Sequence, residues 1–250
     1  MINIILLAPP AAGKGTQAAM ISNNYHIPHI STGDLLRTAA KRHDKLAREL
    51  ENILSTGHLV SDDIVLNLLK KRIINKDCKN GYILDGFPRN IDQAEHYNKI
   101  LDELNVDHGI VILIDVDFEV ASSRILGRLL CPSCGLTYND KIAEMKPVED
   151  NICDKCHSEL IRRSDDNIET FKTRFKNYQD KTYPLIEYYQ KKNMLYHVDG
   201  NQDSESIYRQ IDKIINKCSM DWKYIVIFSL LTYIKIINIY WNVLLILKVV

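Results

Sequence analysis

The sequence lacks an excess of charge of either sign. Its 32 Lys and Arg residues balance 32 Asp and Glu residues, so the formal net charge of the 250 residues is zero. This balance excludes a global electrostatic footprint for nucleic acid or for an acidic membrane surface. Glycine (10 residues) and proline (7 residues) are scarce, which excludes a fibrous or linker-like chain. With 46% hydrophobic and 26% charged residues, the chain has the composition of a folded protein.

Cysteine is scarce as well, and six residues are too few for a secreted disulfide scaffold. Four of them form two C-x-x-C pairs, Cys131 with Cys134 and Cys153 with Cys156. Two such pairs can bring four thiolates together around one zinc ion without a large apolar core. The pattern therefore predicts a structural zinc site in a small insert. A redox pair and a nucleic-acid-binding zinc ribbon are the alternatives.

The N-terminus lacks a basic segment, and its apolar run stops at Pro9. We therefore expect no secretory signal and a cytoplasmic protein. A long apolar stretch occurs only at 224–250, where the length suits a membrane span of ~20 residues. Lys235 near its centre opposes insertion into a bilayer. Three interpretations stay open: packing against the protein or a partner, a membrane anchor, or an extension without a selected role.

Apolar runs of strand length alternate with segments of helical pattern, and nothing repeats at a fixed period. This alternation predicts an α/β fold with a parallel sheet. The expected strands cover residues 2–7, 82–84, 109–116 and 195–198. The expected helices cover residues 16–24, 35–41, 44–54, 62–74, 91–104, 119–128, 167–192 with an interruption near Pro184, and 204–215.

The turn after the first expected strand has the pattern of a phosphate-binding loop. Residues 8–16 read Ala-Pro-Pro-Ala-Ala-Gly-Lys-Gly-Thr, and a helix is expected next. In such a loop, backbone N–H groups and the helix N-terminus hold phosphate oxygens, and a lysine neutralises their charge. The strict pattern is not met, because Ala8 replaces its first glycine and Gly15 follows Lys14. A chance Gly-Lys turn is the alternative.

Asp85 comes directly after a second short apolar run, Tyr82 to Leu84. A carboxylate at the end of a strand beside a phosphate loop is typical of residues that orient water around Mg²⁺. The alternative is a structural role, in which Asp85 caps the helix expected after Asn90.

Several motifs, in the same order along the chain, resemble those of the adenylate kinase family in its bacterial long-lid form. Pro10 and residues 13–16 match the family's G-x-P-G-x-G-K-G-T. Residues 31–34 with Arg37 match S-T-G-D-x-x-R, and residues 85–89 with Gln93 match D-G-F-P-R-x-x-x-Q. Arg163, Asp165, Asp166 and Arg174 match the R-x-D-D element and the arginine beyond it. The resemblance covers residues 1 to about 216 and leaves out the tail, 217–250.

The resemblance implies a parallel-sheet P-loop kinase core with helices on both faces. It also implies a helical insert at 31–60 that binds the nucleoside monophosphate and a zinc-ribbon lid at 128–164. The implied reaction is reversible phosphoryl transfer from ATP-Mg²⁺ to AMP, which gives two ADP. The expected partners are therefore ATP, AMP and ADP, with Mg²⁺ and a structural Zn²⁺ and without nucleic acid, and we expect a monomer.

The resemblance assigns roles to particular residues, among them arginines whose planar guanidinium suits phosphate oxygens. The implied catalytic residues are Lys14, Asp85, Arg89, Arg124, Arg128, Arg163 and Arg174. The implied ATP contacts are Ala11, Ala12, Gly13, Lys14, Gly15, Thr16, Arg128, Thr137, Tyr138 and Gln202. The implied AMP contacts are Thr32, Arg37, His58, Leu59, Val60, Gly86, Phe87, Pro88, Arg89, Gln93, Arg163 and Arg174. The implied zinc ligands are Cys131, Cys134, Cys153 and Cys156.

Two departures from the family pattern keep rival functions open. Ala8 and Ala11 stand where the family has glycine. If either residue has a left-handed backbone, alanine costs on the order of 1 kcal/mol there. If Ala11 lines the phosphates, its methyl group would crowd them. One rival is therefore a nucleotide-binding regulator with impaired catalysis. The other is a kinase for CMP, UMP or GMP, against which Gln93 and the long lid favour AMP.

Overall fold

A computed structural model describes residues 2–41, 47, 48, 50, 53 and 60–219 of the chain. The chain divides into two compact units, residues 1–208 and 209–250, and the described part of the second unit, 209–219, is helical. Most of the helix expected at 44–54 lies outside the described residues, as does the apolar tail at 224–250. Within the described ranges, no helix combines the length and the apolar character needed to cross a bilayer.

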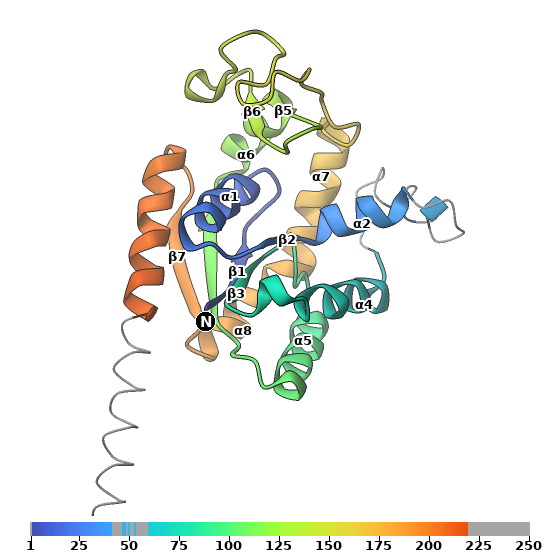
Figure 1. The fold of residues 1–250 in the computed structure, drawn as a ribbon, viewed down its shortest axis with the longest axis vertical. Coiled ribbons are helices and arrows are strands. Elements are labelled where there is room, and N and C mark those ends of the chain that lie inside the picture. The colour runs from blue at the N-terminus through green and yellow to red at the C-terminus, as the bar shows by residue number, and fades with distance from the viewer. Residues whose placement is uncertain (1, 42–46, 49, 51–52, 54–59, 220–250) are drawn as a thin grey trace, which may run out of the picture. The chain divides into compact units, whose positions relative to one another are not determined.

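A five-stranded sheet, with parallel neighbours throughout, forms the centre of the first unit (Figure 1). The strands follow the order β2-β3-β1-β4-β7 across the sheet. They are β1 (Ile2–Leu7), β2 (His29–Ser31), β3 (Gly81–Asp85), β4 (Ile110–Asp115) and β7 (Leu195–Asp199). The order reverses at β1, and in open parallel sheets ligands bind beyond the carboxyl ends of the strands at such a point. The predicted α/β class with a parallel sheet is confirmed.

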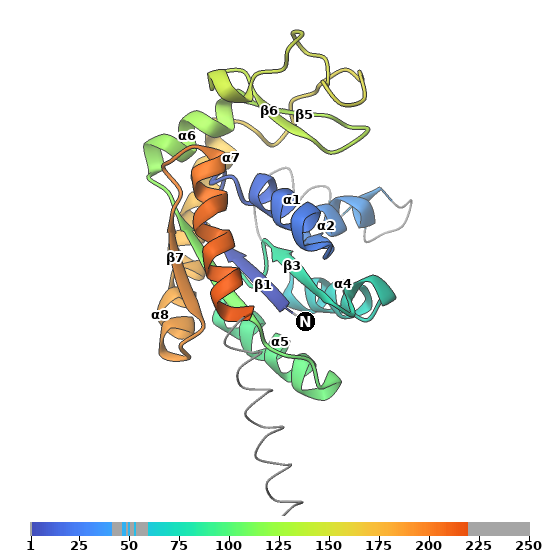
Figure 2. The same cartoon turned by 60° about the vertical axis from the view of Figure 1, so that its left-hand side comes forward.

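Helices cover both faces of this sheet (Figures 1 and 2). On β1, Ile4 and Leu6 point to one face and Ile5 and Leu7 to the other, and all four are at most 3% exposed. This two-sided burial explains the continuous apolar run in the sequence. Ile5 and Leu7 share one apolar core with residues of the helices at 62–73, 91–104 and 184–191.

The helices of the first unit lie close to the predicted segments. They are α1 (Lys14–Tyr25), α2 (Thr32–Ala40), α4 (Asp62–Ile73), α5 (Ile91–Leu104), α6 (Phe118–Gly127), α7 (Ile168–Asn177) and α8 (Pro184–Lys191), with a helix from 204 onward. Short helical turns are η1 (Lys76–Cys78), η2 (Ala143–Met145) and η3 (Tyr178–Thr182). The interruption expected near Pro184 is the wide turn η3, in which Tyr183 N–H donates to the Tyr178 carbonyl at 2.8 Å. A wider turn relieves the clash of a proline ring with the preceding turn of helix.

Residues 128–164, here called the cysteine insert, have a second, two-stranded sheet. Strand β5 (Arg128–Leu130) begins where α6 ends and pairs in antiparallel fashion with β6 (Thr137–Asn139). An isolated bridge from Leu130 to Ile161 joins the start of the insert to its end. Both ends of the cysteine insert therefore lie side by side, next to the end of α6.

Candidate active site

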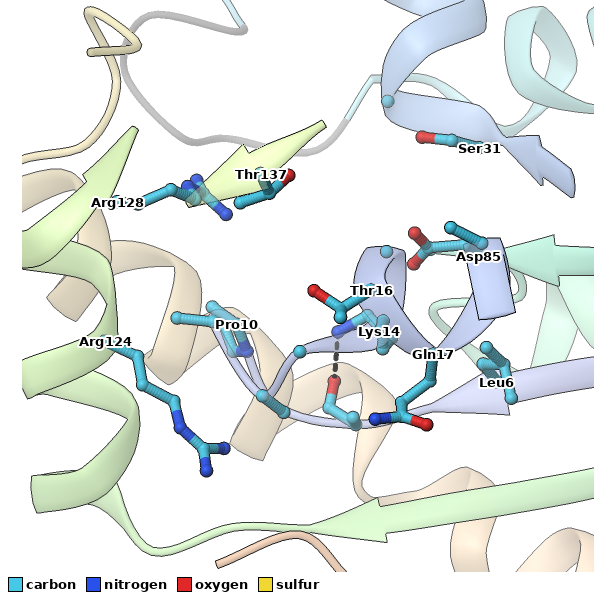
Figure 3. A pocket seen from close by; sticks show the side chains of 18 of the residues that line it. Leu6, Pro10, Lys14, Thr16, Gln17, Ser31, Asp85, Arg124, Arg128 and Thr137 are labelled. Atoms are coloured by element: carbon cyan, nitrogen blue, oxygen red, sulfur yellow. Dashed lines mark hydrogen bonds between the residues drawn. The ribbon is translucent and has the colours of Figure 1, made fainter. Parts of the chain in front are cut away.

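A cavity of about 1010 Å³ opens beyond the carboxyl ends of β1, β2 and β3. The phosphate loop forms part of its wall, and Figure 3 shows Arg124 and Arg128 on one side of this loop and Ser31 and Asp85 on the other. Of the predicted site residues, those that line this cavity are Ala11, Ala12, Gly13, Lys14, Gly15, Thr16, Arg37, Asp85, Gly86, Phe87, Pro88, Arg89, Arg124, Arg128, Thr137, Tyr138, Arg163, Arg174 and Gln202.

The phosphate loop leads from the end of β1 directly into α1. Gly13 precedes the helix with φ of 88°, and no side chain caps the first turn of α1. The uncapped N–H groups and the positive end of the helix dipole therefore face the loop, which is the arrangement that binds phosphate. The predicted strand, loop and helix are all present.

Ala11 and Ala8 differ in backbone conformation, which the sequence left undecided. Ala11 has φ of 63° and lies in the left-handed region, where a methyl group is strained. Ala8, which is 7% exposed, is not among the residues with positive φ. The backbone strain expected from a replaced glycine therefore applies to Ala11, which lines the cavity.

The Lys14 ammonium is held by the loop itself. Its Nζ donates to the carbonyls of Ala8 at 3.0 Å and Pro9 at 2.9 Å. Burial lowers the pKa of Lys14 to about 8, and the positive charges of Arg89 and Arg128 add to this, while Asp85 opposes it. A nearby anion would restore the lysine's charged state, so a phosphate group suits this position.

Asp85 lies at the end of β3, beside His29 of the neighbouring strand β2. His29 Nε2 is 3.3 Å from Asp85 Oδ2. Burial would raise the pKa of Asp85, but the hydrogen bond from His29 and the charge of Lys14 outweigh it and hold the pKa below its usual value. Asp85 is thus kept ionised at the cavity wall, as a carboxylate near a cation requires. The helix-cap alternative is wrong, because the Asn90 side chain accepts from Gln93 N–H at the start of α5.

Three of the predicted arginines are paired with carboxylates. Arg128 Nε donates to Asp166 Oδ2 at 2.7 Å, and Arg174 pairs with Asp165. Arg37 NH2 donates to Asp34 Oδ1 at 2.6 Å. The two aspartates of the R-x-D-D element therefore each hold one arginine of the cavity in place. A bound phosphate would compete with these carboxylates for the same guanidinium groups.

Arg163 and Arg89 are each influenced by the charges of other arginines in the cavity. Burial lowers the pKa of Arg163, and Arg128 and Arg37 lower it further. Burial and then the charge of Arg174 lower the pKa of Arg89. Within the described part of the chain, the buried Nε of Arg163 has no hydrogen-bond partner. Crowded arginines of this kind form a site for a polyanion.

A second, smaller cavity of about 10 Å³ adjoins the first. Thr32 donates from its hydroxyl to the Gly86 carbonyl at 2.9 Å, and Arg89 Nε donates to the same carbonyl at 2.8 Å. The predicted AMP contacts that line this cavity are Thr32, Val60, Gly86, Arg89 and Gln93. The predicted contacts His58 and Leu59 lie outside the described residues.

The predicted catalytic residue Arg124 and the predicted ATP contacts Thr137, Tyr138 and Gln202 come from different segments of the chain. Arg124 NH1 donates to the Gly200 carbonyl at 2.9 Å, and its NH2 donates to the Gln202 carbonyl at 3.2 Å. Thr137 and Tyr138 line the cavity from β6. The Tyr138 hydroxyl is turned toward the cysteines, 3.5 Å from Cys153 Sγ, so only the rest of this side chain is available to the cavity.

The four predicted zinc ligands converge. The Sγ atoms of Cys131, Cys134, Cys153 and Cys156 all lie within 4.8 Å of one another. Cys131 Sγ is 3.3 Å from Cys156 Sγ, and Cys134 Sγ is 3.5 Å from Cys153 Sγ. Tetrahedral Zn–S bonds of about 2.3 Å need sulfurs at this kind of spacing, and four thiolates form a closed, structural site. The donor set fits zinc.

Two residues of the site have no signal in the sequence motifs. His29 contacts Asp85 because β2 and β3 are neighbours, and Asp62 contacts Gln93 because α4 lies against α5. Both contacts join segments more than 30 residues apart, which only the tertiary fold brings together.

Comparisons with known proteins agree with this geometry. The sequence model of the family described as adenylate kinase matches residues 6–194. An adenylate kinase of Archaeoglobus fulgidus is 44% identical over 216 residues, which are 86% of this chain and 99% of that protein. An adenylate kinase of Clostridium perfringens is 44% identical over 214 residues, covering 86% and 97% of the two chains. One from Thermoanaerobacter sp. is 42% identical over 214 residues, covering 86% and 98%. The chain belongs to the adenylate kinase family.

Proposed function

We propose that this enzyme transfers a phosphoryl group reversibly from ATP-Mg²⁺ to AMP and so forms two ADP. One observation carries the proposal: the phosphate loop, Asp85 and arginines from distant segments all line one cavity of about 1010 Å³. Transfer between two polyanions depends on in-line positioning and on neutralised charge. The acceptor phosphate is already an anion, so the reaction needs no strong base.

On the donor side, the phosphate loop holds the ATP phosphates. Lys14 exchanges the carbonyls of Ala8 and Pro9, now at 3.0 and 2.9 Å, for phosphate oxygens. Arg128 exchanges Asp166 in the same way. The present contacts hold the cations in place before the nucleotide arrives, so little reorganisation is needed when it binds.

On the acceptor side, Arg37 and Arg89 bind the AMP phosphate, and Arg163 and Arg174 lie between the two nucleotides. Support comes from the lining of the cavity, which contains all four arginines. Gln93 lines the adjoining small cavity, where it hydrogen-bonds the adenine.

Mg²⁺ fits the residues present at the donor side. The Thr16 hydroxyl and the Asp85 carboxylate both line the cavity, and hydroxyl and carboxylate oxygens suit this ion. When bound with ATP, Mg²⁺ neutralises charge on the phosphates. Asp85 stays ionised here because His29 and Lys14 lower its pKa against the effect of burial.

The cysteine insert acts as a lid with a structural zinc ion. Thr137, Ile142 and Met145 of the insert line the cavity, so movement of the insert opens or closes it to water. Exclusion of water protects the transferring group from hydrolysis and strengthens the electrostatic contacts.

A direct test is steady-state phosphorylation of AMP, CMP, UMP and GMP with ATP-Mg²⁺ in one assay. We expect ADP formation from AMP to exceed product formation from the other three by at least tenfold in kcat/KM. Preference for a different monophosphate would replace the proposed acceptor. ATP binding without turnover of any monophosphate would instead favour the regulator.

A further inference from the structure

Gln93 is a buried side chain whose amide is held at both ends. It lies in the first turn of α5 and is 2% exposed. Its Oε1 accepts from the Arg89 backbone N–H at 2.7 Å. Its Nε2 donates to Asp62 Oδ1 at 2.6 Å. Turning the amide by 180° would therefore break both hydrogen bonds.

Asp62 begins α4 and connects this helix to the start of α5. Besides Gln93, its carboxylate accepts from Asn90 Nδ2, at 3.1 Å to Oδ2 and 3.4 Å to Oδ1. A carboxylate at a helix N-terminus also interacts well with the helix dipole. Asp63, the next residue, is exposed and can serve the dipole equally, so the dipole does not explain why Asp62 faces Gln93.

The chemistry of these partners permits one orientation of the amide. A backbone N–H only donates, so it selects the amide oxygen, and an ionised carboxylate only accepts, so it selects the amide nitrogen. An amide nitrogen has a second hydrogen and an amide oxygen a second lone pair. Gln93 therefore offers one donor and one acceptor, in a fixed left-right order, to whatever enters the small cavity.

The rest of that cavity is lined largely by apolar side chains, and at about 10 Å³ it has to widen before a base can enter it beside Gln93. Its other lining residues include Leu36, Val60 and Val65. The Thr32 hydroxyl is already bonded to Gly86. A purine base that enters the cavity thus meets apolar side chains and the edge of one oriented amide.

Adenine and hypoxanthine differ at the edge that an amide can recognise. Adenine has an amino donor at C6 beside an acceptor at N1, whereas hypoxanthine has an oxygen acceptor at C6 beside an N1–H donor. The two bases have the same shape, but their donor and acceptor are interchanged. A reversed amide would pair with hypoxanthine as well as the present one pairs with adenine.

We propose that Asp62 is a specificity-determining positioning residue, which selects AMP over 6-oxopurine nucleotides by fixing the amide of Gln93. The proposal rests on the proposed function, because it assumes that the small cavity holds the base of the acceptor. Asp62 touches no substrate and acts through Gln93. Reversing the amide would break the bond to Arg89 N–H and would set Oε1 against the Asp62 carboxylate, so both contacts oppose hypoxanthine.

The test uses Asp62→Asn, with the exposed neighbour Asp63→Asn as the matched control. An Asn at 62 can donate or accept, so it no longer opposes the reversed amide. Initial rates with AMP and with IMP, at saturating ATP-Mg²⁺, give kcat and KM for each acceptor. We expect the AMP-to-IMP ratio of kcat/KM to fall about tenfold in Asp62→Asn, mostly through KM, and to stay within twofold of wild type in Asp63→Asn.

An Asp62 with a merely structural role would lower both kcat/KM values together and leave their ratio unchanged, which would overturn the proposal. Thermal melting of each variant identifies loss of folding, and Asp62→Ser provides a second, smaller substitution with the same expected fall in the ratio. Absence of AMP turnover in the wild-type enzyme would contradict the proposed function itself. Wild-type turnover with an unchanged ratio in both Asp62 variants would contradict this proposal alone.

Discussion

The sheet and the cysteine insert are stabilised by different means. On one face of the sheet, a large apolar core joins residues of the strands, such as Leu84, with residues of the helices, such as Tyr97 and Tyr189. Each of these three is at most 1% exposed. The apolar cluster of the insert has five residues, which are Leu129, Cys131, Tyr138, Cys153 and Leu160. Two of these five are predicted zinc ligands. Burial alone can hold the sheet, whereas we expect the small insert to need a metal in order to fold.

This difference separates stability from movement. A segment that a metal folds as a unit can move as a unit, because its internal contacts do not depend on the core below it. The connection to the rest of the first unit runs through the two adjacent ends of the insert, where Leu130 is bridged to Ile161. We therefore expect the cysteine insert to close over the cavity without disturbing the sheet.

Removal of zinc is expected to have the largest effect on stability and to unfold only the cysteine insert. In small zinc domains the metal contributes about 10–16 kcal/mol to folding. A chelator should make the cysteine insert sensitive to protease and lower the melting temperature, with a smaller effect on the rate constant well below melting. Limited proteolysis, calorimetry and turnover after chelation measure the three quantities.

The matched control for chelation is re-addition of Zn²⁺, which should restore both the protease resistance and the melting temperature. A loss of turnover at low temperature as severe as the loss of stability would contradict the separation of the two regions. So would protease cleavage that begins within the sheet.

The opposite half of the comparison is tested by Leu84→Ala. Leu84 lies on β3, is 0% exposed and belongs to the large core. Removing it should lower the free energy of unfolding by about 2–5 kcal/mol. Urea unfolding measures the change, and the zinc content should stay the same. Leu104→Ala, at a residue that is 37% exposed, is the control and should cost under about 1 kcal/mol. Loss of zinc in Leu84→Ala would show that the regions are coupled.

The sequence predicted those parts of the fold that have a local signal. Apolar residues recur at helical spacing within 91–104, and α5 forms over the same range. Strand β2 was missed, because its three residues, His29–Ser31, include one apolar side chain. Its strand conformation comes from pairing with β3, a contact that a local pattern does not record.

The candidate site shows the same limit. Lys14 and Asp85 were predictable because each follows a buried strand, and the carboxyl ends of parallel strands meet at one edge. The side chains that hydrogen-bond to the site residues were not predictable. His29 and Asp166 reach Asp85 and Arg128 through tertiary contacts, and neither residue type implies its partner. The backbone of Ala11 also depended on the loop that contains it.

The sheet half of the molecule also contains a group that opposes stability, Lys14. Its ammonium is charged at neutral pH although burial lowers its pKa to about 8. Lys14→Met should therefore raise the free energy of unfolding by ~1–2 kcal/mol, a value reduced for water in the cavity and for the loss of two hydrogen bonds to carbonyls. Turnover should fall at least 100-fold. Urea unfolding and steady-state kinetics measure the two effects.

The pH dependence provides the control for Lys14→Met. The folded pKa, about 8, lies below the usual 10.5, so between these values the unfolded chain binds more protons and stability rises with pH. The advantage of the variant should be full below pH 8 and should disappear as the pH rises toward 10.5. An advantage that is constant from pH 7 to pH 10 would contradict burial of the charge as its cause.

The smallest expected effect concerns Ala11. Its replacement tests whether the phosphate loop adds to the stability of the sheet region or opposes it. With φ of 63°, Ala11 should release about 1 kcal/mol when replaced by glycine. Ala11→Gly should also raise kcat/KM for ATP about fivefold, because the methyl group leaves the cavity wall. Ala8→Gly is the matched control, since Ala8 lacks positive φ, and it should give neither gain. Equal gains in both variants would show that loop flexibility, not strain at Ala11, limits the binding of ATP.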